Sequence, residues 1–331
     1  MSLIAFTRDR TRVNGRFRTL SRPQFITTIM QLHLWDEFKE VPNVIETALQ
    51  MGAVLVASES GGKDSQAMLK LLLHLKETRK WPGSLVAVHA HLGRIEWLQT
   101  LPHVEQICSN TGVDLTVVQR KKGDLIDRWR ERYEELKRTG EEKLKPFWSS
   151  SLNRYCTSDL KRTPIDKFLR QFPFVVCAIG LRSSESIKRA KEPQVKVRFS
   201  ITTKRLQNLD PDTALSLWTN NPTGRLALNW NPILHFDLEQ VWQWCGTSTA
   251  QWNRRRKLPD DEALDGWPAH PAYVLGHGNE RLSCSFCILG SESDLRNAIA
   301  YNRETYSILV SMEGESGWSF QHKRSLLSLS S

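Results

Sequence analysis

The sequence lacks any apolar run close to the roughly 18–20 residues that a membrane-spanning helix needs. Its short initial apolar stretch is followed by basic residues and not preceded by them, which is not the pattern of a secretory signal peptide. It has no internal repeat, no low-complexity segment and no motif typical of a known DNA- or RNA-binding fold. These absences exclude collagen-like and wholly disordered chains, and they predict a cytoplasmic protein without a membrane partner.

The residues that are present describe a globular protein of more than one part. Its 331 residues exceed the usual domain size of roughly 100–200 residues. Hydrophobic residues make up 40% and charged residues 25%, which is enough apolar material for a real core. The net charge of +10 favours a polyanionic partner. Six cysteines in a cytosolic protein indicate metal binding or catalysis more often than disulfides, and twelve tryptophans can serve as core or as stacking surfaces for bases.

Short apolar runs alternate with helical patterns in the first half of the chain. Alternation of this kind predicts an α/β fold with a doubly wound, mostly parallel sheet and helices on both faces. The runs predicted as strands are 53–57, 85–89, 115–118 and 174–179, and the predicted helices are 43–50, 64–77, 101–110, 124–142 and 237–244.

Three regions follow from this pattern. We predict a basic N-terminal extension at residues 1–42 and a nucleotide-binding α/β domain at residues 43–190. A loop-rich C-terminal region at residues 191–331 carries a cysteine cluster and completes the active site. The basic, valine-rich segment 188–204 is predicted to form an exposed hairpin.

The sharpest local signal is the sequence SGGKDS, residues Ser60–Ser65, between a predicted strand and a predicted helix. Glycines let the backbone approach a phosphate closely, and the N-terminus of the helix adds a favourable dipole. Lys63 supplies a positive charge. The order strand, SGGKDS, helix favours this phosphate loop over a structural turn. Because Asp64 follows the lysine, the segment differs from the GxxxxGK[ST] loop of common ATPases.

The phosphate loop resembles the pyrophosphate-binding loop of the PP-loop ATP pyrophosphatase superfamily. Further segments resemble its phosphoadenosine phosphosulfate reductase branch, and the resemblance covers roughly residues 45–290. It implies a fold like that of the adenine nucleotide alpha hydrolases, with an adenine nucleotide in the crevice at the carboxyl ends of the strands. The segments are His91–Arg94, Arg154–Thr157 with Leu160, Lys161 and Pro164, Gly180–Arg182 with Glu185 and Ser186, and Asn231–Ile233 with Val241 and Trp242.

The resemblance also implies roles for single residues. Lys63, Asp64 and Arg182 are the candidate catalytic residues, and Arg94 is a second guanidinium for the phosphates or the acceptor. The family often carries an acidic residue where this chain has His91, so we assign His91 no metal-binding role. ATP would be held, with Mg²⁺ bridging its phosphates, by Ser60, Gly61, Gly62, Lys63, Asp64, Ser65 and Arg94.

The cysteines suggest a metal centre. Cys284 and Cys287 form a CxxC pair, which places two thiolates within reach of one metal or cluster. Cys156 lies among cations that favour its thiolate form. The resemblance brings these three residues together around a [4Fe–4S] cluster. The related reductases have a cysteine doublet upstream, but here Tyr155 precedes Cys156.

One cluster ligand is therefore missing. Cys245 is our candidate for the fourth ligand, a layout that resembles the sulfur-inserting enzymes of DNA phosphorothioation. Alternatively, three ligands leave one iron open to exogenous sulfide, as in some tRNA-thiolating relatives. Zinc is a further alternative, because His270 and His277 lie near the CxxC pair in sequence.

The other cysteines and the basic segments allow structural readings as well. Cys108 and Cys177 are predicted to be buried structural thiols. Arg120–Lys122, Arg254–Lys257 and the arginines of the first eighteen residues could contact the phosphates of a nucleic acid, or form a solvated surface. Trp252, beside the second of these runs, could stack on a base.

These features together predict an ATP pyrophosphatase-type sulfurtransferase. It would adenylate an acceptor, expected to be nucleic acid, and release pyrophosphate. It would then transfer sulfur to the acceptor in an iron–sulfur-dependent step, and a donor such as a cysteine desulfurase would supply the sulfur. One alternative is a sulfonucleotide reductase, although no cysteine follows Cys287 to act as its mobile nucleophile. Another is a non-catalytic subunit that binds nucleotide or nucleic acid.

Overall fold

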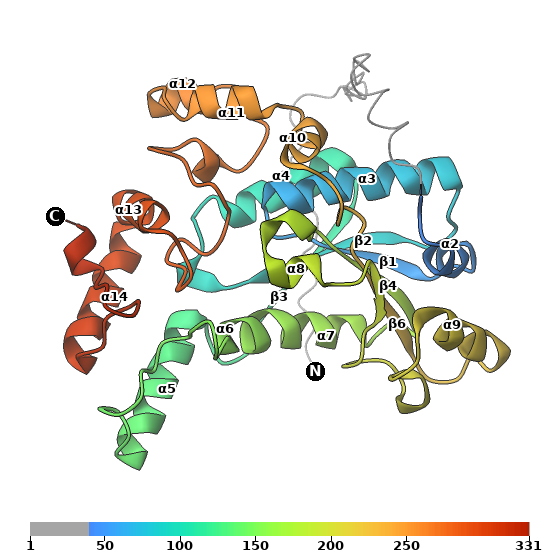
Figure 1. Cartoon of the computed structure of the whole chain (residues 1–331), viewed down its shortest axis with the longest axis horizontal. Coiled ribbons are helices and arrows are strands. Elements are labelled where there is room, and N and C mark those ends of the chain that lie inside the picture. The colour runs from blue at the N-terminus through green and yellow to red at the C-terminus, as the bar shows by residue number, and fades with distance from the viewer. Residues whose placement is uncertain (1–39, 331) are drawn as a thin grey trace, which may run out of the picture. The chain divides into compact units, whose positions relative to one another are not determined.

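Six strands form one sheet within residues 40–330, the part of the chain that the computed structural model describes. The order is β3-β2-β1-β4-β6-β5; all neighbours are parallel except β5, which runs antiparallel to β6 at one edge. The predicted α/β class with a mostly parallel sheet is confirmed (Figure 1). The strands are β1 (Val54–Ser58), β2 (Leu85–His91), β3 (Asp114–Gln119), β4 (Phe174–Ile179), β5 (Val195–Val197) and β6 (Leu226–Trp230).

Helices cover both faces of the sheet, as the alternating pattern predicts. In Figure 1, α3 (Lys63–Arg79) and α4 (Thr100–Thr111) lie on one face and α7 (Thr163–Leu169) on the other. The side chains of Ile165 and Leu169 join the apolar core beneath α7. A parallel sheet buried on both faces explains why its central strands are almost wholly apolar.

The strand order creates a switch point beside β1. The chain adds β2 and then β3 on one side of β1, and it then crosses back to add β4 on the other side. The loops after β1 and β4 therefore diverge at the carboxyl ends of adjacent strands. In open α/β sheets a crevice at such a point is where ligands bind.

The predicted boundary at residue 190 does not divide the structure. Both β5 and β6 lie beyond it and complete the same sheet, and Glu40–Ser331 groups as one compact unit. The predicted hairpin at 188–204 is also wrong, because β5 pairs with β6 about thirty residues later in the chain. The predicted extension at 1–42 lies outside the described residues except for residues 40–42.

The last hundred residues are helical and build a second core. The helix α10 packs against α3. Loop aromatics such as Phe147, Trp148, Phe286 and Phe320 join α5, α13 and α14 in this core. The remaining helices and turns are α2 (Asn43–Gln50), η1 (Gly93–Ile95), α5 (Leu125–Thr139), α6 (Tyr155–Thr157), η2 (Ser158–Arg162), η3 (Ser183–Glu185), α8 (Ile187–Ala190), η4 (Lys204–Leu206), α9 (Pro211–Asn220), α10 (Leu238–Cys245), α11 (Thr249–Arg255), α12 (Asp260–Leu264), η5 (Pro271–Tyr273), α13 (Glu292–Tyr301), α14 (Arg303–Ser316) and η6 (Leu327–Leu329).

No helix in this described part of the chain combines the length and the apolar character needed to cross a membrane.

Candidate functional site

The phosphate loop joins the end of β1 to the start of α3 at the switch point. Gly61 has a positive φ of 79°, a conformation that favours glycine. The buried carboxylate of Glu59 accepts hydrogen bonds from the Gly61 amide at 2.9 Å and from the Ser65 hydroxyl. Burial raises the pKa of Glu59 to about 7. Glu59 thus holds the two ends of the loop together through these hydrogen bonds. The sequence analysis missed this role, although Glu59 immediately precedes SGGKDS.

Lys63, Asp64 and Arg182 form a buried charged group at the first turn of α3. The Lys63 ammonium lies 3.2 Å from one oxygen of Asp64, and the Arg182 guanidinium donates to the other. Burial lowers the pKa of Lys63. Burial by itself would raise the pKa of Asp64, but the charges of Lys63 and Arg182 outweigh it and the pKa is lowered. The structure brings together these three predicted catalytic residues.

Two groups from distant parts of the chain support this turn. The Tyr273 hydroxyl accepts a hydrogen bond from the Lys63 amide at 3.0 Å, and its ring lies 5.2 Å from the Lys63 ammonium. Gly180, after β4, packs so closely that a Cβ atom there would lie 2.9 Å from the backbone of Asp64. This contact requires glycine and holds Arg182, two residues later, against the loop.

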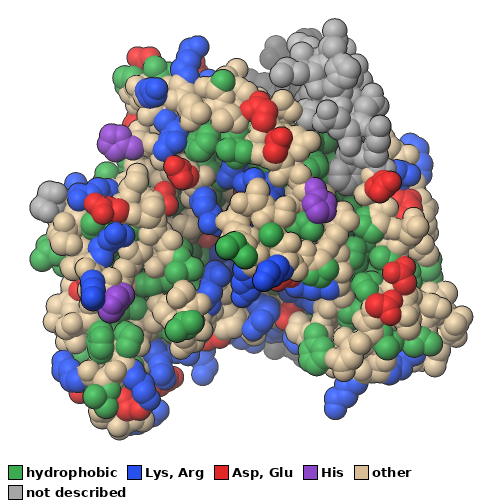
Figure 2. Space-filling model, in the orientation of Figure 1, with side chains coloured by type: hydrophobic (Ala, Val, Ile, Leu, Met, Phe, Trp, Pro, Cys, Tyr) green, Lys and Arg blue, Asp and Glu red, His purple; other side chains and the backbone are tan. Residues whose placement is uncertain are grey.

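Arginines surround the cavity above the loop. A cavity of about 110 Å³ is lined by loop residues together with Arg189 and Arg281, and a hollow of about 380 Å³ beside it reaches Arg182 and Arg256. Burial first, and then the charges of Arg281, Arg154 and Arg182, lower the pKa of Arg189. Figure 2 shows Lys and Arg side chains gathered near the middle of this face, around α8.

Glu185 is the acidic partner of this arginine group (Arg154, Arg182, Arg189 and Arg281). Its carboxylate pairs with Arg189 and lies 3.3 Å from Arg281. A second carboxylate, Asp64, pairs with Arg182. Two carboxylates do not neutralise four guanidinium groups, so the surface suits a polyanion such as a triphosphate or a nucleic acid backbone. The sequence analysis missed Arg189 and Arg281, which no local motif distinguishes from exposed arginines.

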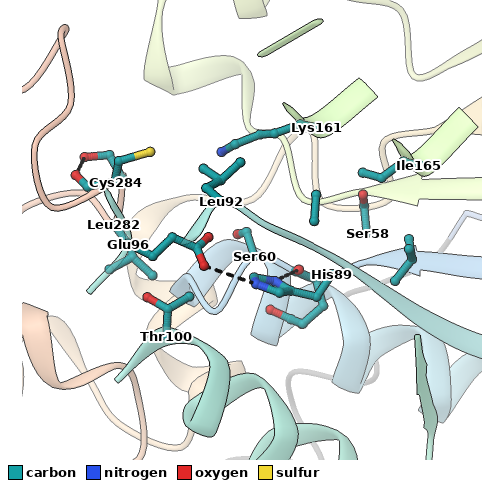
Figure 3. A pocket seen from close by; sticks show the side chains of 14 residues that line it. Ser58, Ser60, His89, Leu92, Glu96, Thr100, Lys161, Ile165, Leu282 and Cys284 are labelled. Atoms are coloured by element: carbon teal, nitrogen blue, oxygen red, sulfur yellow. Dashed lines mark hydrogen bonds and ion pairs between the residues drawn. The ribbon is translucent and has the colours of Figure 1, made fainter. Parts of the chain in front are cut away.

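A second cavity of about 110 Å³ connects the loop with the cysteines (Figure 3). Ser60 and Glu59 line one side, and Lys161 and Cys284 line the other. The ends of β1 and β2 form its floor, where His89 and Glu96 also face the cavity.

Three cysteines gather at the border of the second core. Cys156 lies on α6, and Cys284 and Cys287 lie on the loop before α13. Burial raises the pKa of the Cys284 thiol to about 12, with the Lys161 ammonium acting against burial and Cys287 and Cys156 adding to it. The thiols are thus within electrostatic reach of one another although Cys156 is distant in sequence. We call these three residues the cysteine group.

The sulfurs of the cysteine group do not form the compact ligand set of a single zinc ion. Tetrahedral zinc–thiolate bonds of about 2.3 Å place the sulfurs roughly 3.8 Å apart. Among residues 40–330, no three cysteine or histidine ligand atoms that include these sulfurs lie within 4.8 Å of one another. The two ring nitrogens of His270 are occupied by the Thr100 hydroxyl and the Ala272 amide, and His277 is exposed.

Cys245 lies apart from the cysteine group. It is fully buried on α10, where its thiol donates to the Lys63 carbonyl at 3.3 Å. Burial raises the pKa of this thiol to about 12, and the neighbouring charges come from the phosphate loop and from Lys70. Cys245 thus supports the loop and does not complete a four-cysteine ligand set. Cys108 and Cys177 are buried as predicted.

Arg94 also differs from its predicted role. Its guanidinium makes a two-point contact with Asp124, with distances of 2.6 and 2.8 Å, and contacts Asp127 at 2.6 Å. Both carboxylates belong to the first turn of α5, where Asp124 is the N-cap. Arg94 therefore anchors α5 to η1, and it does not line the cavities at the phosphate loop.

The second basic run has a structural role as well. Trp252 is buried, donates to the Tyr273 carbonyl and stacks near Trp242, so its ring is not available to a base. Arg255 and Arg256 donate to backbone carbonyls of following loops. The run therefore ties the C-terminal loops together, and only its end residues are exposed.

Solved structures with a similar arrangement include three proteins of known activity. A phosphoadenylyl-sulfate reductase from Candida auris, in a phosphate complex, is 13% identical, with 65% of this chain and 83% of that chain covered and a TM-score of 0.38. The U34-tRNA thiolase NcsA from Methanococcus maripaludis, with its [4Fe-4S] cluster, is 16% identical, with 86% of this chain and 75% of that chain covered and a TM-score of 0.41. The FMN adenylyltransferase of Candida glabrata, with FMN and AMPCPP, is 14% identical, with 70% of this chain and 62% of that chain covered and a TM-score of 0.37.

A comparison with curated proteins gave no match. The sequence itself matches the phosphoadenosine phosphosulfate reductase domain over residues 54–254, which spans the sheet, the phosphate loop and the start of the C-terminal helices. The chain belongs to the phosphoadenosine phosphosulfate reductase domain family.

Proposed function

We propose that the chain is an ATP-dependent sulfurtransferase that adenylates a nucleic acid and replaces an oxygen of that acceptor with sulfur. The observation that carries the proposal is a continuous path through the site. The phosphate loop, the cavity beside it and the cysteine group adjoin one another, and Ser60 and Cys284 line the same cavity.

The phosphate loop supports binding of ATP. Lys63 and the arginine group place positive charge around the cavity that would take the β- and γ-phosphates. Asp64 offers a carboxylate oxygen, the ligand type that Mg²⁺ prefers, and Mg²⁺ would share the charge of the phosphates.

Adenylation is the first step that this arrangement supports. An oxygen of the acceptor attacks the α-phosphorus, a new P–O bond forms, and the bond to the β-phosphate oxygen breaks, so that pyrophosphate leaves with the electron pair. Lys63 and Arg182 stabilise the charge on the leaving group. Hydrosulfide then attacks the carbon that bears this oxygen, so that a C–S bond forms and the C–O bond breaks. AMP leaves with the oxygen and the electron pair, and the sulfur loses its proton to solvent, an exchange that needs no oxidant or reductant.

The cysteine group supports the sulfur step. Three cysteine sulfurs beside an apolar core are the soft ligands that a [4Fe–4S] cluster takes, and they would bind it as thiolates. When bound, that cluster would supply a site for inorganic sulfide. Lys161, across the cavity from the phosphate loop, is placed to attract the sulfide anion toward the adenylated acceptor.

The experiment is a pyrophosphate-release assay on anaerobically purified protein with ATP, Mg²⁺, sulfide and cellular RNA or DNA. We expect pyrophosphate release together with sulfur-containing nucleosides detected by mass spectrometry. Lys63→Ala should lower the rate by about 100-fold or more, as loss of a charge-stabilising group does. Lys204→Ala, which alters an exposed lysine on η4, is the matched control and should behave as wild type does.

Three outcomes would contradict the proposal. Reduction of phosphoadenosine phosphosulfate without pyrophosphate release from ATP would assign the reductase activity. Tight binding of ATP without turnover would assign a binding subunit. Pyrophosphate release that persists in Lys63→Ala would place the chemistry elsewhere.

A further inference from the structure

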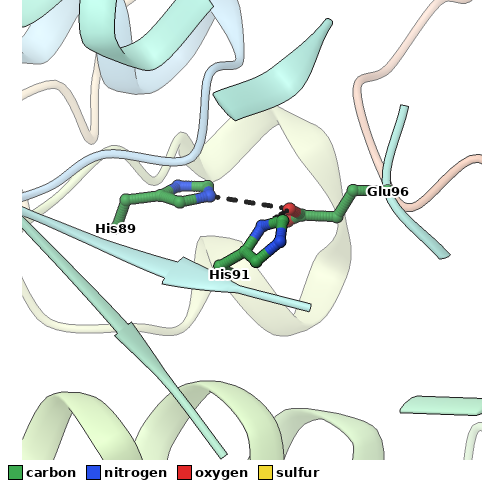
Figure 4. A group of neighbouring side chains, drawn as sticks. All are labelled: His89, His91 and Glu96. Atoms are coloured by element: carbon green, nitrogen blue, oxygen red, sulfur yellow. Dashed lines mark hydrogen bonds and ion pairs between the residues drawn. The ribbon is translucent and has the colours of Figure 1, made fainter. Parts of the chain in front are cut away.

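Two histidines and a glutamate meet at the end of β2 (Figure 4). His89 and His91 are two residues apart on a strand, so their side chains point to the same face of the sheet. Glu96 follows the η1 turn and reaches back toward both rings. We call these three residues the His–Glu site. Only 2% of the His89 side chain and 10% of the Glu96 side chain are exposed.

The ligand-type atoms of this site are close together. The Nδ1 atom of His91 lies 2.7 Å from Oε2 of Glu96, and Nε2 of His89 lies 3.6 Å from the same oxygen. All three groups offer one ligand atom within 4.8 Å of the others, and this is the one such set of three or more in residues 40–330. The 3.6 Å separation is close to that of two atoms bound to one metal ion, and the 2.7 Å contact is a hydrogen bond that such an ion would replace.

The contact with the Glu59 backbone sets the tautomer of the neutral His89 ring. Its Nδ1 atom lies 2.9 Å from the backbone carbonyl of Glu59, which only accepts, so Nδ1 carries the hydrogen. In the neutral ring the buried Nε2 atom then carries a lone pair, and it has no hydrogen-bond partner. That lone pair faces the Glu96 carboxylate. Two electron-rich atoms that face each other in a buried position call for a cation between them.

We propose that His89 Nε2, His91 Nδ1 and the Glu96 carboxylate bind one divalent transition-metal ion, of the class of Zn²⁺ or Fe²⁺. Two imidazoles and one carboxylate form the ligand set of many zinc and non-haem iron sites, whereas Mg²⁺ and Ca²⁺ prefer oxygen ligands alone. Metal-binding histidines usually donate their other N–H to a carbonyl or carboxylate, as His89 does to Glu59.

The ion would be open to a ligand on one side. Three protein ligands leave at least one coordination position free. His89 and Glu96 line the cavity that Ser60 and Cys284 share, so water or an oxygen or sulfur atom of a bound molecule has access to that position. This site uses no side chain of the cysteine group or of the phosphate loop Ser60–Ser65, although it shares a cavity with both, and it does not depend on the proposed function.

A proton is the competing occupant. In that arrangement His91 is protonated and pairs with Glu96. The hydrogen bond with Glu96 raises the pKa of His91, and the two histidines hold the pKa of Glu96 at about 2 in spite of burial. A metal-binding measurement separates the two cases, because a protonated pair does not retain a stoichiometric ion.

The test uses the full chain with Cys284→Ser and Cys287→Ser, which removes the CxxC ligands. The protein is stripped with a chelator and titrated with Zn²⁺ and with Co²⁺. We expect one ion per chain, visible d–d bands for Co²⁺, and no near-ultraviolet charge-transfer band from thiolate to cobalt. His91→Ala should weaken binding by about 100-fold or more, and His91→Asp, which restores a ligand, should recover most of it.

His235→Ala is the matched control, since His235 is exposed and lies outside this site. It should bind the ion as the parent does. Absence of stoichiometric Zn²⁺ or Co²⁺, or affinity that His91→Ala leaves unchanged, would overturn the proposal. Circular dichroism of each variant distinguishes loss of a ligand from loss of the fold.

Discussion

His270 lies fully buried behind the phosphate loop and was considered from the sequence as a zinc ligand. A Cβ atom placed on Gly61 would lie 3.7 Å from its ring, so the ring forms part of the wall that supports the loop. Burial, with His103 adding a smaller effect, lowers the pKa of His270 to about 3. The ring is therefore neutral in the folded protein at neutral pH.

We predict that His270 makes the protein sensitive to acid. Between pH 6.5 and pH 3 the unfolded chain protonates this histidine and the folded chain does not, so the free energy of unfolding falls as the pH falls. Above pH 6.5 the contribution is complete. The loss should approach about 4 kcal/mol by pH 3. Denaturant unfolding at pH 7, 6, 5 and 4 measures it.

The comparison uses His270→Asn, whose amide can still accept from the Ala272 amide but does not titrate. Its stability deficit relative to wild type should shrink as the pH is lowered from 6.5. His235→Ala, at an exposed position, should keep a constant difference from wild type. A deficit in His270→Asn that is constant or grows with acid would contradict the prediction.

Single residues also show what the sequence could not predict. The loop residues Lys63 and Asp64 could be predicted because a contiguous motif between a strand and a helix fixes their environment. Arg94 and Cys245 have side chains suited to their predicted roles in binding phosphate and metal. Their roles differ because each contacts a partner that is distant in the sequence, Asp124 for Arg94 and the Lys63 carbonyl for Cys245. The sequence analysis gave His91 no metal-binding role, because an imidazole stands where the family often has an acidic residue. The proposed His–Glu site depends on Glu96, which follows a turn that periodicity does not describe.

At the scale of elements, the positions of most buried strands and long helices could be predicted from the local pattern of apolar residues. β4 has the predicted bounds, and α3 exceeds its predicted range by one residue at the start and two at the end. β6 was missed because it is short, fully buried and contains Asn229, so it shows no alternation. β5 was assigned to a hairpin because its antiparallel partner is a strand that local pattern had not identified.

The packing of β4 against α3 leads to a prediction at Gly180. A Cβ atom there would lie 2.9 Å from backbone atoms of Asp64 and Ser65, which cannot rotate away as a side chain can. We expect Gly180→Ala to lower the free energy of unfolding by about 1–3 kcal/mol. It should also weaken ATP binding, because the start of α3 moves away from Arg182. Denaturant unfolding and calorimetric titration with a non-hydrolysable ATP analogue measure the two effects.

Gly314→Ala is the matched control for this substitution. Gly314 lies exposed within α14, and a Cβ atom there would have no neighbour within 4 Å. Alanine should stabilise this helix by up to about 1 kcal/mol and leave nucleotide affinity unchanged. If Gly180→Ala behaves as Gly314→Ala does, the close packing of β4 on the loop is not required.

At the scale of the whole molecule, positive charge is concentrated beside the phosphate loop, where segments that are distant in the sequence meet. The net charge is +10, and the arginine group comes from three segments that lie far apart in the sequence. Other cations are committed to internal contacts, such as Arg94 with α5 and Arg256 with loop carbonyls. Arg182, Arg189 and Arg281 of the arginine group line the cavities at the phosphate loop, where they are placed to contact a phosphate-rich partner.

This concentration of charge predicts salt-sensitive binding of nucleic acid at the arginine group. Each phosphate contact releases counterions, so the logarithm of the affinity falls linearly with the logarithm of the salt concentration. Fluorescence anisotropy with a labelled single-stranded RNA at several salt concentrations measures the slope. Arg281→Ala, which removes a side chain that is 58% exposed, should lower the magnitude of the slope by about one, the value for one phosphate contact. Lys204→Ala, at an exposed position on η4, should leave it unchanged, and equal slopes for Arg281→Ala and wild type would place the nucleic acid elsewhere.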